Sequence, residues 1–215
     1  MENLRGLHVL TDREAVKSRS LAEIIQLAIA GGAAAIQLRD KDVEDLSMIK
    51  LGEELMKLTK GKVPLIVDDR VEVALAIGAD GVHVGQKDMP ARAVRKKIGS
   101  GKILGVSAHS VREAVQAEED GADYIGAGPV FPTKTKKDAE TPIGLTGLRQ
   151  IKNAVSIPII AIGGIKTDNA AVVMEIADGI AVISAVLRAT FPLKATQTLV
   201  SIINYEKSRR RNINR

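Results

Sequence analysis

The sequence contains no cysteine, and only 2% of its 215 residues are aromatic. Without cysteine the chain can form neither disulfides nor thiolate metal sites, which excludes a disulfide-stapled fold. With so few aromatic side chains, stacking platforms for nucleic-acid bases are scarce. The sequence also lacks an uninterrupted apolar run of the roughly 18 residues that a membrane span requires. We therefore expect neither a nucleic-acid partner nor a membrane association.

The composition is that of a single globular domain. The first residues, MENLRGLHVLTDRE, include no apolar segment long enough for a signal peptide. Hydrophobic residues make up 45% of the chain, which is enough to form a sizeable core. The length suits one α/β barrel. We expect a soluble, cytoplasmic protein.

The net charge of +5 is concentrated near the C-terminus. Basic residues gather in the last nine positions, at Lys207, Arg209, Arg210, Arg211 and Arg215. Lys and Arg number 31 in total, and without these five they equal the 26 Asp and Glu. Short basic ends are usually solvated and frayed. We therefore expect a folded domain over residues 1–206 and a basic tail over residues 207–215.

Short apolar segments rich in β-branched residues alternate with amphipathic segments. The predicted strands are Leu7–Leu10, Ala35–Leu38, Leu65–Val67, Gly81–Val84, Ile103–Val106, Tyr124–Ala127, Pro158–Ile162 and Ile180–Ile183. Between them apolar residues recur at helical spacing. Strands that alternate with helices and are apolar on both faces indicate a buried parallel sheet. The expected fold class is α/β, a single-domain (β/α)8 TIM barrel. No G-x-G-x-x-G motif follows the first strand, which disfavours an open dinucleotide-binding sheet.

Charged residues gather at the predicted carboxyl ends of the strands, where the active sites of such barrels lie. Arg39, Lys41 and Lys136 supply positive charge from different loops, as binding of a diphosphate requires. Asp69 and Asp88 offer hard oxygen ligands, and Mg²⁺ typically takes one or two carboxylates together with water and substrate phosphates. These residues predict a magnesium–diphosphate site. The competing interpretation is a set of ordinary salt bridges.

A second anion site is predicted after the seventh and eighth strands. Gly163 and Gly164 let backbone approach a ligand closely, and a helix is expected to begin near residues 167–169. Ser184 follows the neighbouring strand. Barrels of this class often bind a phosphate in this position. The alternative is that the glycines only form a tight turn.

Several segments form a specific combination when they are taken in order. They are QLRDK at Gln37–Lys41, DDRVEVALAIGADGVHVGQKD at Asp68–Asp88, GVSAHS at Gly105–Ser110, GPVFPTKTKKD at Gly128–Asp138, AIGGI at Ala161–Ile165 and VISA at Val182–Ala185. With this spacing the chain resembles the thiamine phosphate synthase family from about Leu7 to Val186. The resemblance implies a transferase of thiamine biosynthesis that acts on small phosphorylated molecules.

The resemblance also assigns roles to residues. It implies that Asp69 and Asp88 hold Mg²⁺, the expected cofactor. The implied catalytic residues are Arg39, Lys41, Ser107 and Lys136. The implied substrate-binding residues are Gln37, Leu38, Arg39, Asp40, Lys41, Asp68, Ser107, Thr133, Lys134, Thr135, Lys136, Gly164, Ile183 and Ser184. Among them, Thr133, Thr135, Gly164, Ile183 and Ser184 are expected to hold a thiazole phosphate, and residues of the earlier strands a pyrimidine methyl diphosphate.

The family reaction explains why few proton-transfer groups are needed. Diphosphate leaves the pyrimidine methylene, a carbocation-like centre forms, and the thiazole nitrogen attacks it. Positive charge at the rim would stabilise the departing diphosphate. Whether the thiazole is the plain or the carboxylated form stays open.

The chain departs from the family pattern at two rim positions. The residue before the first metal aspartate is usually asparagine, whereas here it is Asp68, which cannot donate a hydrogen bond while ionised. Lys87 stands where an acidic residue is common. These departures concern fine specificity and not the reaction class.

Other functions remain open from the residues alone. A thiazole phosphate tautomerase of the same superfamily would bind only the thiazole phosphate and have no use for the acidic and basic set. A non-catalytic phosphate sensor would need only the Gly163–Gly164 region. Another phosphosugar isomerase or aldolase is compatible with the fold. Assembly into a homo-oligomer is also open. His8 and His83 lie inside apolar strands and are expected to be hydrogen-bonded core residues.

Overall fold

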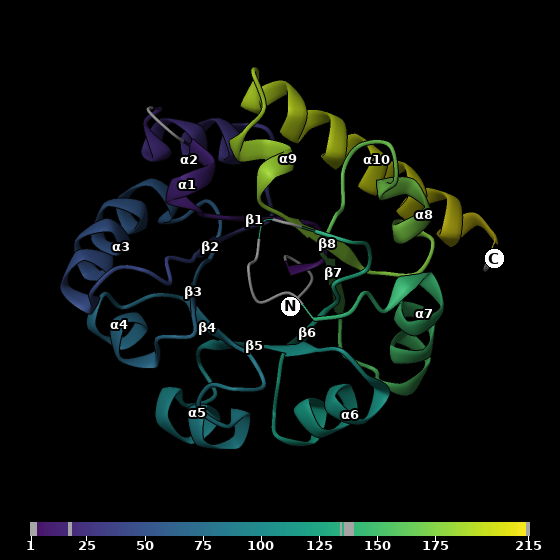
Figure 1. Ribbon diagram of the computed structural model, residues 1–215, viewed down its shortest axis with the longest axis horizontal. Helices are drawn as coiled ribbons and strands as arrows, with labels where there is room; N and C mark the ends of the chain where they lie inside the picture. The colour runs from purple at the N-terminus through teal and green to yellow at the C-terminus, as the bar shows by residue number, and fades with distance from the viewer. Residues whose placement is uncertain (1–3, 17–18, 134, 136–139, 214–215) are drawn as a thin grey trace.

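The computed structural model describes residues 4–16, 19–133, 135 and 140–213. It shows a closed barrel of parallel strands, each paired with its neighbour in chain order, with helices around the outside (Figure 1). The strands are β1 (Leu7–Leu10), β2 (Ala35–Leu38), β3 (Leu65–Asp68), β4 (Gly81–Val84), β5 (Ile103–Ala108), β6 (Tyr124–Ala127), β7 (Ile159–Ile162) and β8 (Gly179–Val182). The predicted TIM barrel is confirmed.

The strands differ from the prediction only at their ends. β3 and β5 run further, to Asp68 and Ala108, so Asp68 and Ser107 belong to strands and not to the loops after them. β7 begins at Ile159, after Pro158, which has no N–H to donate to the ladder. β8 is displaced by one residue towards the N-terminus. These extensions place two predicted site residues on the rigid wall of the barrel.

Helices follow the strands and form the outer layer. They are α1 (Arg13–Val16), α2 (Leu21–Ala30), α3 (Asp45–Thr59), α4 (Val71–Ala76), α5 (Ala91–Ile98), α6 (Val111–Glu119), α7 (Gly144–Ala154), α8 (Ala170–Met174), α9 (Ser184–Leu187) and α10 (Pro192–Ile213). Two of them start with a capping serine. Ser20 Oγ accepts from Glu23 N–H, and Ser110 Oγ accepts from Glu113 N–H, each at 3.3 Å. None of the helices over the described residues is long and apolar enough to span a membrane.

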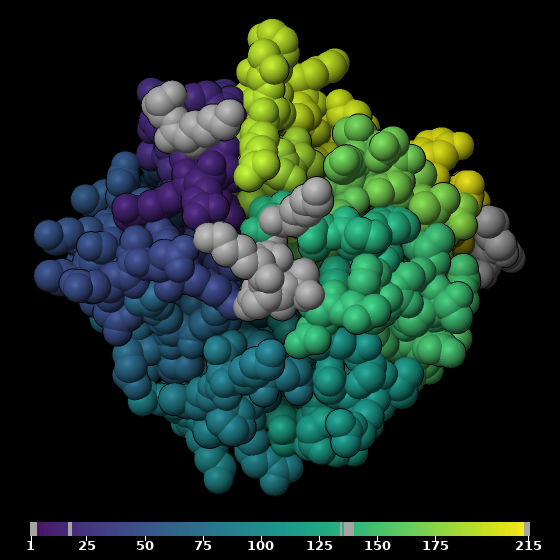
Figure 2. Space-filling view, viewed as in Figure 1, coloured from purple at the N-terminus to yellow at the C-terminus, as the bar shows by residue number. Residues whose placement is uncertain are grey.

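The last helix closes the ring. Segments succeed one another in chain order around the perimeter, so that the N-terminal and C-terminal colours meet at the top of the view (Figure 2). α10 packs against both α2 and α8. The first and last parts of the chain therefore belong to one continuous layer.

The expected basic tail is largely part of α10. This helix runs without a break to Ile213, so no element ends at residue 206. Arg209 pairs with Glu175 at 2.7 Å, and Arg210 donates to the carbonyl of Ala177 at 2.8 Å. The expectation of a solvated end overlooked these partners on the segment before β8. The division into a domain over residues 1–206 and a tail over residues 207–215 stays a prediction.

Polar side chains lie inside the barrel below its rim. The strand register pairs Asp68 with His83 and Gly105 with Tyr124. Residues paired in this way on parallel strands point to the same face of the sheet. The ring of Tyr124 lies 5.5 Å from that of His8 and 5.4 Å from that of His83, measured between centroids. The barrel interior thus contains histidine and tyrosine directly beneath the site described next.

Candidate active site

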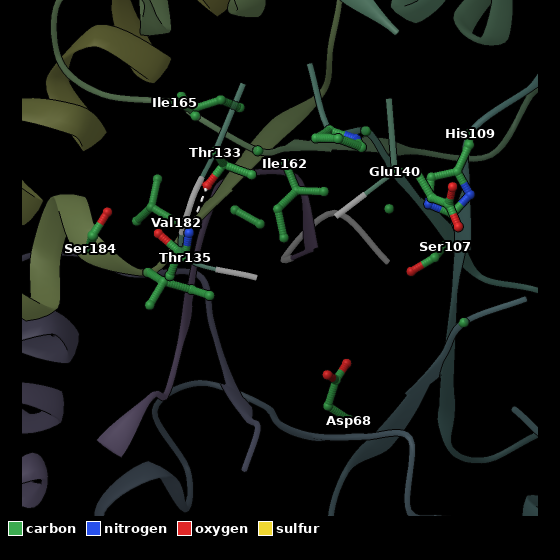
Figure 3. Close-up of a pocket in the computed structure, with 18 of the residues that line it drawn as sticks. Asp68, Ser107, His109, Thr133, Thr135, Glu140, Ile162, Ile165, Val182 and Ser184 are labelled. Atoms are coloured by element: carbon green, nitrogen blue, oxygen red, sulfur yellow. Dashed lines mark hydrogen bonds between the residues drawn. The ribbon is translucent and has the colours of Figure 1, made fainter. Parts of the chain in front are cut away.

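A cavity of about 510 Å³ opens at the carboxyl ends of the strands. Asp68 on β3 and Ser107 on β5 point into it, and Ser184, at the start of α9, lies on the opposite side (Figure 3). A second cavity of about 260 Å³ shares Lys41, Asp68, Asp69 and Asp88 with the first. Arg39 lines only this second cavity. Described residues from both predicted anion sites therefore line two cavities that share part of their walls.

Asp69 is held in an unusual backbone conformation directly after β3. Its φ is 63°, in the left-handed region that non-glycine residues rarely adopt. Its N–H donates to the carbonyl of His83 at 2.7 Å, which fixes the bend. Burial and the neighbouring carboxylates of Asp68 and Asp88 raise the pKa of Asp69 to about 7, although Lys41 acts in the opposite direction. The positive charge around the Asp69 carboxylate is therefore too small to balance the negative charge of its neighbours.

Asp88 completes an acidic pair from the next loop. Its Oδ2 accepts from the N–H of Gly85 at 2.7 Å, which orients the carboxylate. Lys41 Nζ lies 3.9 Å from Asp69 Oδ2 and is 43% exposed, so it neutralises the pair only in part. Among the described residues, no three His, Asp or Glu side chains converge as an all-protein metal site.

The acidic pair fits Mg²⁺ in the mode that uses few protein ligands. Magnesium takes oxygen ligands and keeps several waters, so one or two carboxylates suffice when substrate phosphates supply the rest. A carboxyl whose pKa is raised by neighbouring carboxylates gains most from a nearby cation. The donor set and its unbalanced negative charge therefore suit a divalent cation.

Arg39 is buried between two carboxylates. Its guanidinium lies 3.8 Å from Asp12 Oδ2 and 3.5 Å from Asp68 Oδ2. Gln37 donates from Nε2 to the other oxygen of Asp68. The Asp68 carboxylate is thus in contact with a cation and an amide donor inside the barrel. The competing interpretation, that the charged rim residues form ordinary salt bridges, is therefore correct for Arg39, whose charge is paired with Asp12 and Asp68.

Two other residues of the β2 segment, Leu38 and Asp40, were also predicted to bind substrate. The side chain of Leu38 is fully buried and lies near Gly52 of α3, away from the cavity. Asp40 Oδ2 pairs with Arg13 Nε at 2.8 Å. The side chain of Leu38 therefore lies away from the cavities, whereas Asp40 pairs with Arg13 and also lines the second cavity.

Ser107 is hydrogen-bonded from below by a buried pair. Ser107 Oγ lies 2.9 Å from His83 Nε2, and His83 Nδ1 lies 2.9 Å from Tyr124 Oη. His83 was expected to be a satisfied core histidine, and both its ring nitrogens indeed have partners. Its contact with a cavity residue was not foreseen.

The opposite wall is built from the ends of β6, β7 and β8. Gly163 and Gly164 have positive φ values of 99° and 66° and approach the chain of Pro129 and Pro132. A Cβ at Gly164 would lie 2.8 Å from the carbonyl oxygen of Pro132, so this close contact requires glycine. Ile183 and Ser184 line the same wall. The glycine pair therefore makes a tight turn and also borders the cavity.

The loop after β6 contributes two threonines. Thr135 N–H donates to Thr133 Oγ1 at 3.3 Å, and both residues line the cavity (Figure 3). Lys134 and Lys136, predicted from the same segment, lie outside the described residues.

Sequence reasoning missed Asp12, His83 and Tyr124. Asp12 pairs with Arg39 from a loop distant in the sequence. Two glycines could have signalled the buried pair, because Gly105 and Gly126 interrupt apolar strands where a side chain would otherwise be expected.

Comparisons with known proteins show the family of the chain. The family described as thiamine monophosphate synthase matches residues 7–186. The thiamine-phosphate synthases of Roseiflexus castenholzii and Chloroflexus aurantiacus are each 54% identical to the chain, cover 92% of it, and are themselves covered over 88% and 92% of their lengths. The solved structure of thiamine phosphate pyrophosphorylase from Pyrococcus furiosus is 45% identical, has a TM-score of 0.86, and covers 95% of this chain and 98% of its own. The chain belongs to the thiamine monophosphate synthase family.

Proposed function

We propose that this protein is a transferase that forms thiamine phosphate. It joins 4-amino-2-methyl-5-pyrimidinylmethyl diphosphate to 4-methyl-5-(2-phosphoethyl)thiazole, or to its carboxylated form, and releases diphosphate. The observation that carries the proposal is the two-sided site. Lys41, Asp69 and Asp88 lie on one side of the cavity, and Gly164 and Ser184 lie on the other. Two phosphorylated substrates would then meet between them.

The diphosphate substrate is assigned to the side formed by β2–β5. Arg39 and Lys41 provide positive charge near the acidic pair, and Lys136 is assigned a third charge from family resemblance. Gln37 and Asp68 offer polar atoms to the aminopyrimidine. Asp68 accepts hydrogen bonds from amino groups, and it holds Arg39 in place. Charge at this position stabilises the diphosphate as its bond to carbon lengthens.

Asp69 and Asp88 would hold Mg²⁺ beside the diphosphate. When bound there, the ion supplies positive charge to the departing oxygens. The protein residues around it orient the substrate and keep water from the methylene carbon. Ser107 adds a hydroxyl on the cavity wall between the two sides.

The thiazole phosphate is assigned to the side formed by β6–β8. Thr133, Thr135, Gly164, Ile183 and Ser184 would fix its phosphate and align its nitrogen with the methylene carbon. The carbon–oxygen bond breaks with its electron pair on diphosphate, and the nitrogen lone pair forms the new carbon–nitrogen bond. Alignment of the two reactants supplies much of the rate enhancement, because no protein nucleophile takes part.

The direct test mixes purified protein, Mg²⁺ and both substrates, and measures thiamine phosphate and diphosphate. We expect equal amounts of the two products, and no product when the metal is chelated. Absence of product with the thiazole phosphate still bound would instead favour a tautomerase or a sensor.

Single substitutions separate the two sides. Asp88→Ala should raise the Mg²⁺ concentration for half-maximal rate at least about tenfold. Ser184→Ala should raise the KM for the thiazole phosphate about tenfold, the effect of one hydrogen bond to a charged group, without changing the metal requirement. Asp120→Ala and Ser201→Ala are matched controls, since both residues lie on outer helices or their ends. Identical effects of the two site variants on both parameters would contradict the two-sided assignment.

A further inference from the structure

We propose that Tyr124 and His83 are positioning residues that fix the direction of hydrogen bonding at Ser107. In this arrangement the Ser107 O–H points into the cavity as a hydrogen-bond donor. The inference rests on the proposed function in one respect, namely that the acceptor in the cavity is an atom of the bound pyrimidine diphosphate. Neither Tyr124 nor His83 needs to touch that substrate.

The three side chains form a continuous line from the barrel interior to the cavity. Tyr124 Oη and His83 Nδ1 are 2.9 Å apart, and His83 Nε2 and Ser107 Oγ are also 2.9 Å apart. Tyr124 is 1% exposed and His83 is 7% exposed, whereas Ser107 lines the cavity. The two imidazole nitrogens therefore connect a buried phenol with a hydroxyl that a ligand can reach.

Two glycines create the space that this line occupies. A Cβ at Gly105 would lie 2.2 Å from Tyr124 Cζ and 2.4 Å from His83 Nδ1. A Cβ at Gly126 would lie 2.8 Å from His83 Cε1. Even alanine at either position would displace the imidazole or the phenol. The neighbouring strands β5 and β6 are thus shaped around the Tyr124–His83 pair.

The chemistry of the phenol sets the direction of the first hydrogen bond. Burial, with smaller contributions from Asp68 and Asp123, raises the pKa of Tyr124 above its ordinary value, so the phenol keeps its proton. Within the described part of the chain, the hydrogen-bond partner of its hydroxyl is His83 Nδ1. A buried O–H without an acceptor would cost about 1–3 kcal/mol. Tyr124 therefore donates, and His83 Nδ1 accepts.

The direction of the second hydrogen bond follows from the first. A neutral imidazole has one N–H, so a ring that accepts at Nδ1 carries its proton on Nε2. His83 Nε2–H then donates to Ser107 Oγ. Ser107 Oγ accepts this hydrogen bond, so its single O–H is left to donate to an acceptor on the cavity side. A phosphate oxygen or ring nitrogen of the pyrimidine substrate is the kind of acceptor that this donor would align.

The tautomer can be measured in the free protein without any substrate. The chain contains only three histidines, so ¹⁵N-histidine labelling and long-range ¹H–¹⁵N correlation give few signals. Loss of signals in His83→Gln identifies those of His83. We expect a single tautomer with the proton on Nε2. In Tyr124→Phe, which removes the donor to Nδ1, we expect this preference to weaken. A proton on Nδ1 in the wild-type protein would overturn the inference.

Kinetics test whether Tyr124 acts through Ser107. Tyr124→Phe should lower kcat about three- to tenfold, the worth of one hydrogen bond, with the melting temperature measured in parallel. In a Ser107→Ala background the same substitution should change kcat by less than about twofold. Tyr205→Phe is the matched control, because Tyr205 is the other tyrosine of the chain and lies exposed on α10.

The two readouts separate failure of this inference from failure of the proposed function. Equal losses from Tyr124→Phe with and without the Ser107 hydroxyl would show that Tyr124 acts by another route, and this would overturn the inference. An inactive wild-type protein would contradict the proposed function. In that case the NMR measurement still decides whether Tyr124 sets the direction of the hydrogen bonds.

Discussion

Asp69 and Asp88 line the same cavity at the rim of the barrel, although both are acids, and Asp88 raises the pKa of Asp69. Carboxylates placed close together disfavour ionisation of one another. Burial, together with the carboxylates of Asp68 and Asp88, raises the pKa of Asp69 to about 7. Ionisation without a cation is therefore unfavourable at this position.

Asp69→Asn should stabilise the metal-free protein while abolishing product formation. The unfolded chain ionises Asp69 near its ordinary pKa of 3.8, whereas the folded protein does so near 7. Stability is consequently lost as pH rises through that window, and the substitution removes the loss. Asparagine also tolerates the positive φ of 63°. We expect a gain of up to about 4 kcal/mol at pH 8, or roughly 8–16 °C in melting temperature.

The same melting curves contain their own control. The gain should be smaller at pH 4, where Asp69 is protonated in the folded protein. Mg²⁺ should raise the melting temperature of the wild-type protein but not that of Asp69→Asn. An equal gain at both pH values would show that the backbone conformation, and not the charge, is responsible.

His8 should make stability depend on pH in the opposite direction. Burial lowers the pKa of His8 from 6.5 to about 4, and a hydrogen bond to the carbonyl of Leu4 offsets this in part. The unfolded chain therefore binds a proton between pH 6.5 and 4 while the folded protein does not. The contribution is fully present above pH 6.5, declines as pH falls, and is lost below about pH 4.

A comparison with His8→Gln isolates this effect. The difference in unfolding free energy between wild type and variant should change by about 3 kcal/mol from pH 7 to pH 4. Denaturant titrations at several pH values measure it. A constant difference over this range would mean that the folded and unfolded chains bind this proton equally, so that folding does not lower the pKa of His8.

Gly105→Ala should destabilise the barrel and Gly101→Ala should not. The added methyl group at Gly105 would collide with Tyr124 and His83, and overpacking of this kind costs about 1–3 kcal/mol. At Gly101 the same group meets nothing within 4 Å, and the backbone does not require glycine. Thermal unfolding of the two variants tests the prediction. Equal melting temperatures would show that the interior of the barrel can make room.

Arg210→Ala should lower stability without changing turnover. Arg210 donates to the carbonyl of Ala177 at the amino end of β8, on the opposite side of the barrel from the cavity. Loss of this contact is worth about 1 kcal/mol, or roughly 2–4 °C. Arg211→Ala is the matched control, since Arg211 is an exposed residue of the same helix. A fall in turnover with unchanged stability would contradict a structural role for the end of α10.

The alternation of apolar and amphipathic segments predicted the barrel, because strand and helix periods are local properties of the chain. The same local pattern placed Asp69 and Ser184 at strand ends. It did not show that Leu38 points outwards, although side chains alternate along a strand and Gln37 points inwards. The resemblance supplied the whole motif and not alternate residues, and a substrate contact of Leu38 stays a prediction.

Pairings between distant segments were not accessible from the sequence. Arg39 meets Asp12 and Asp68 because the barrel closes, and no spacing along the chain encodes this contact. The Tyr124–His83 hydrogen bond depends on strand register in the same way. The basic end of the chain was read as solvated because its partner, the carbonyl of Ala177, is a backbone group that any residue carries.

Closure of the barrel through β1 and β8 has a consequence for biosynthesis. Leu7 pairs with Ile180, so the first strand cannot complete its ladder until nearly the whole chain has left the ribosome. At about 5–20 residues per second, that interval is on the order of ten to thirty seconds. During it β1 presents an apolar edge with unpaired N–H and C=O groups, the feature that favours association with other strands. The nascent chain is therefore most exposed to aggregation before the enzyme exists, and chaperone capture in that interval would protect it.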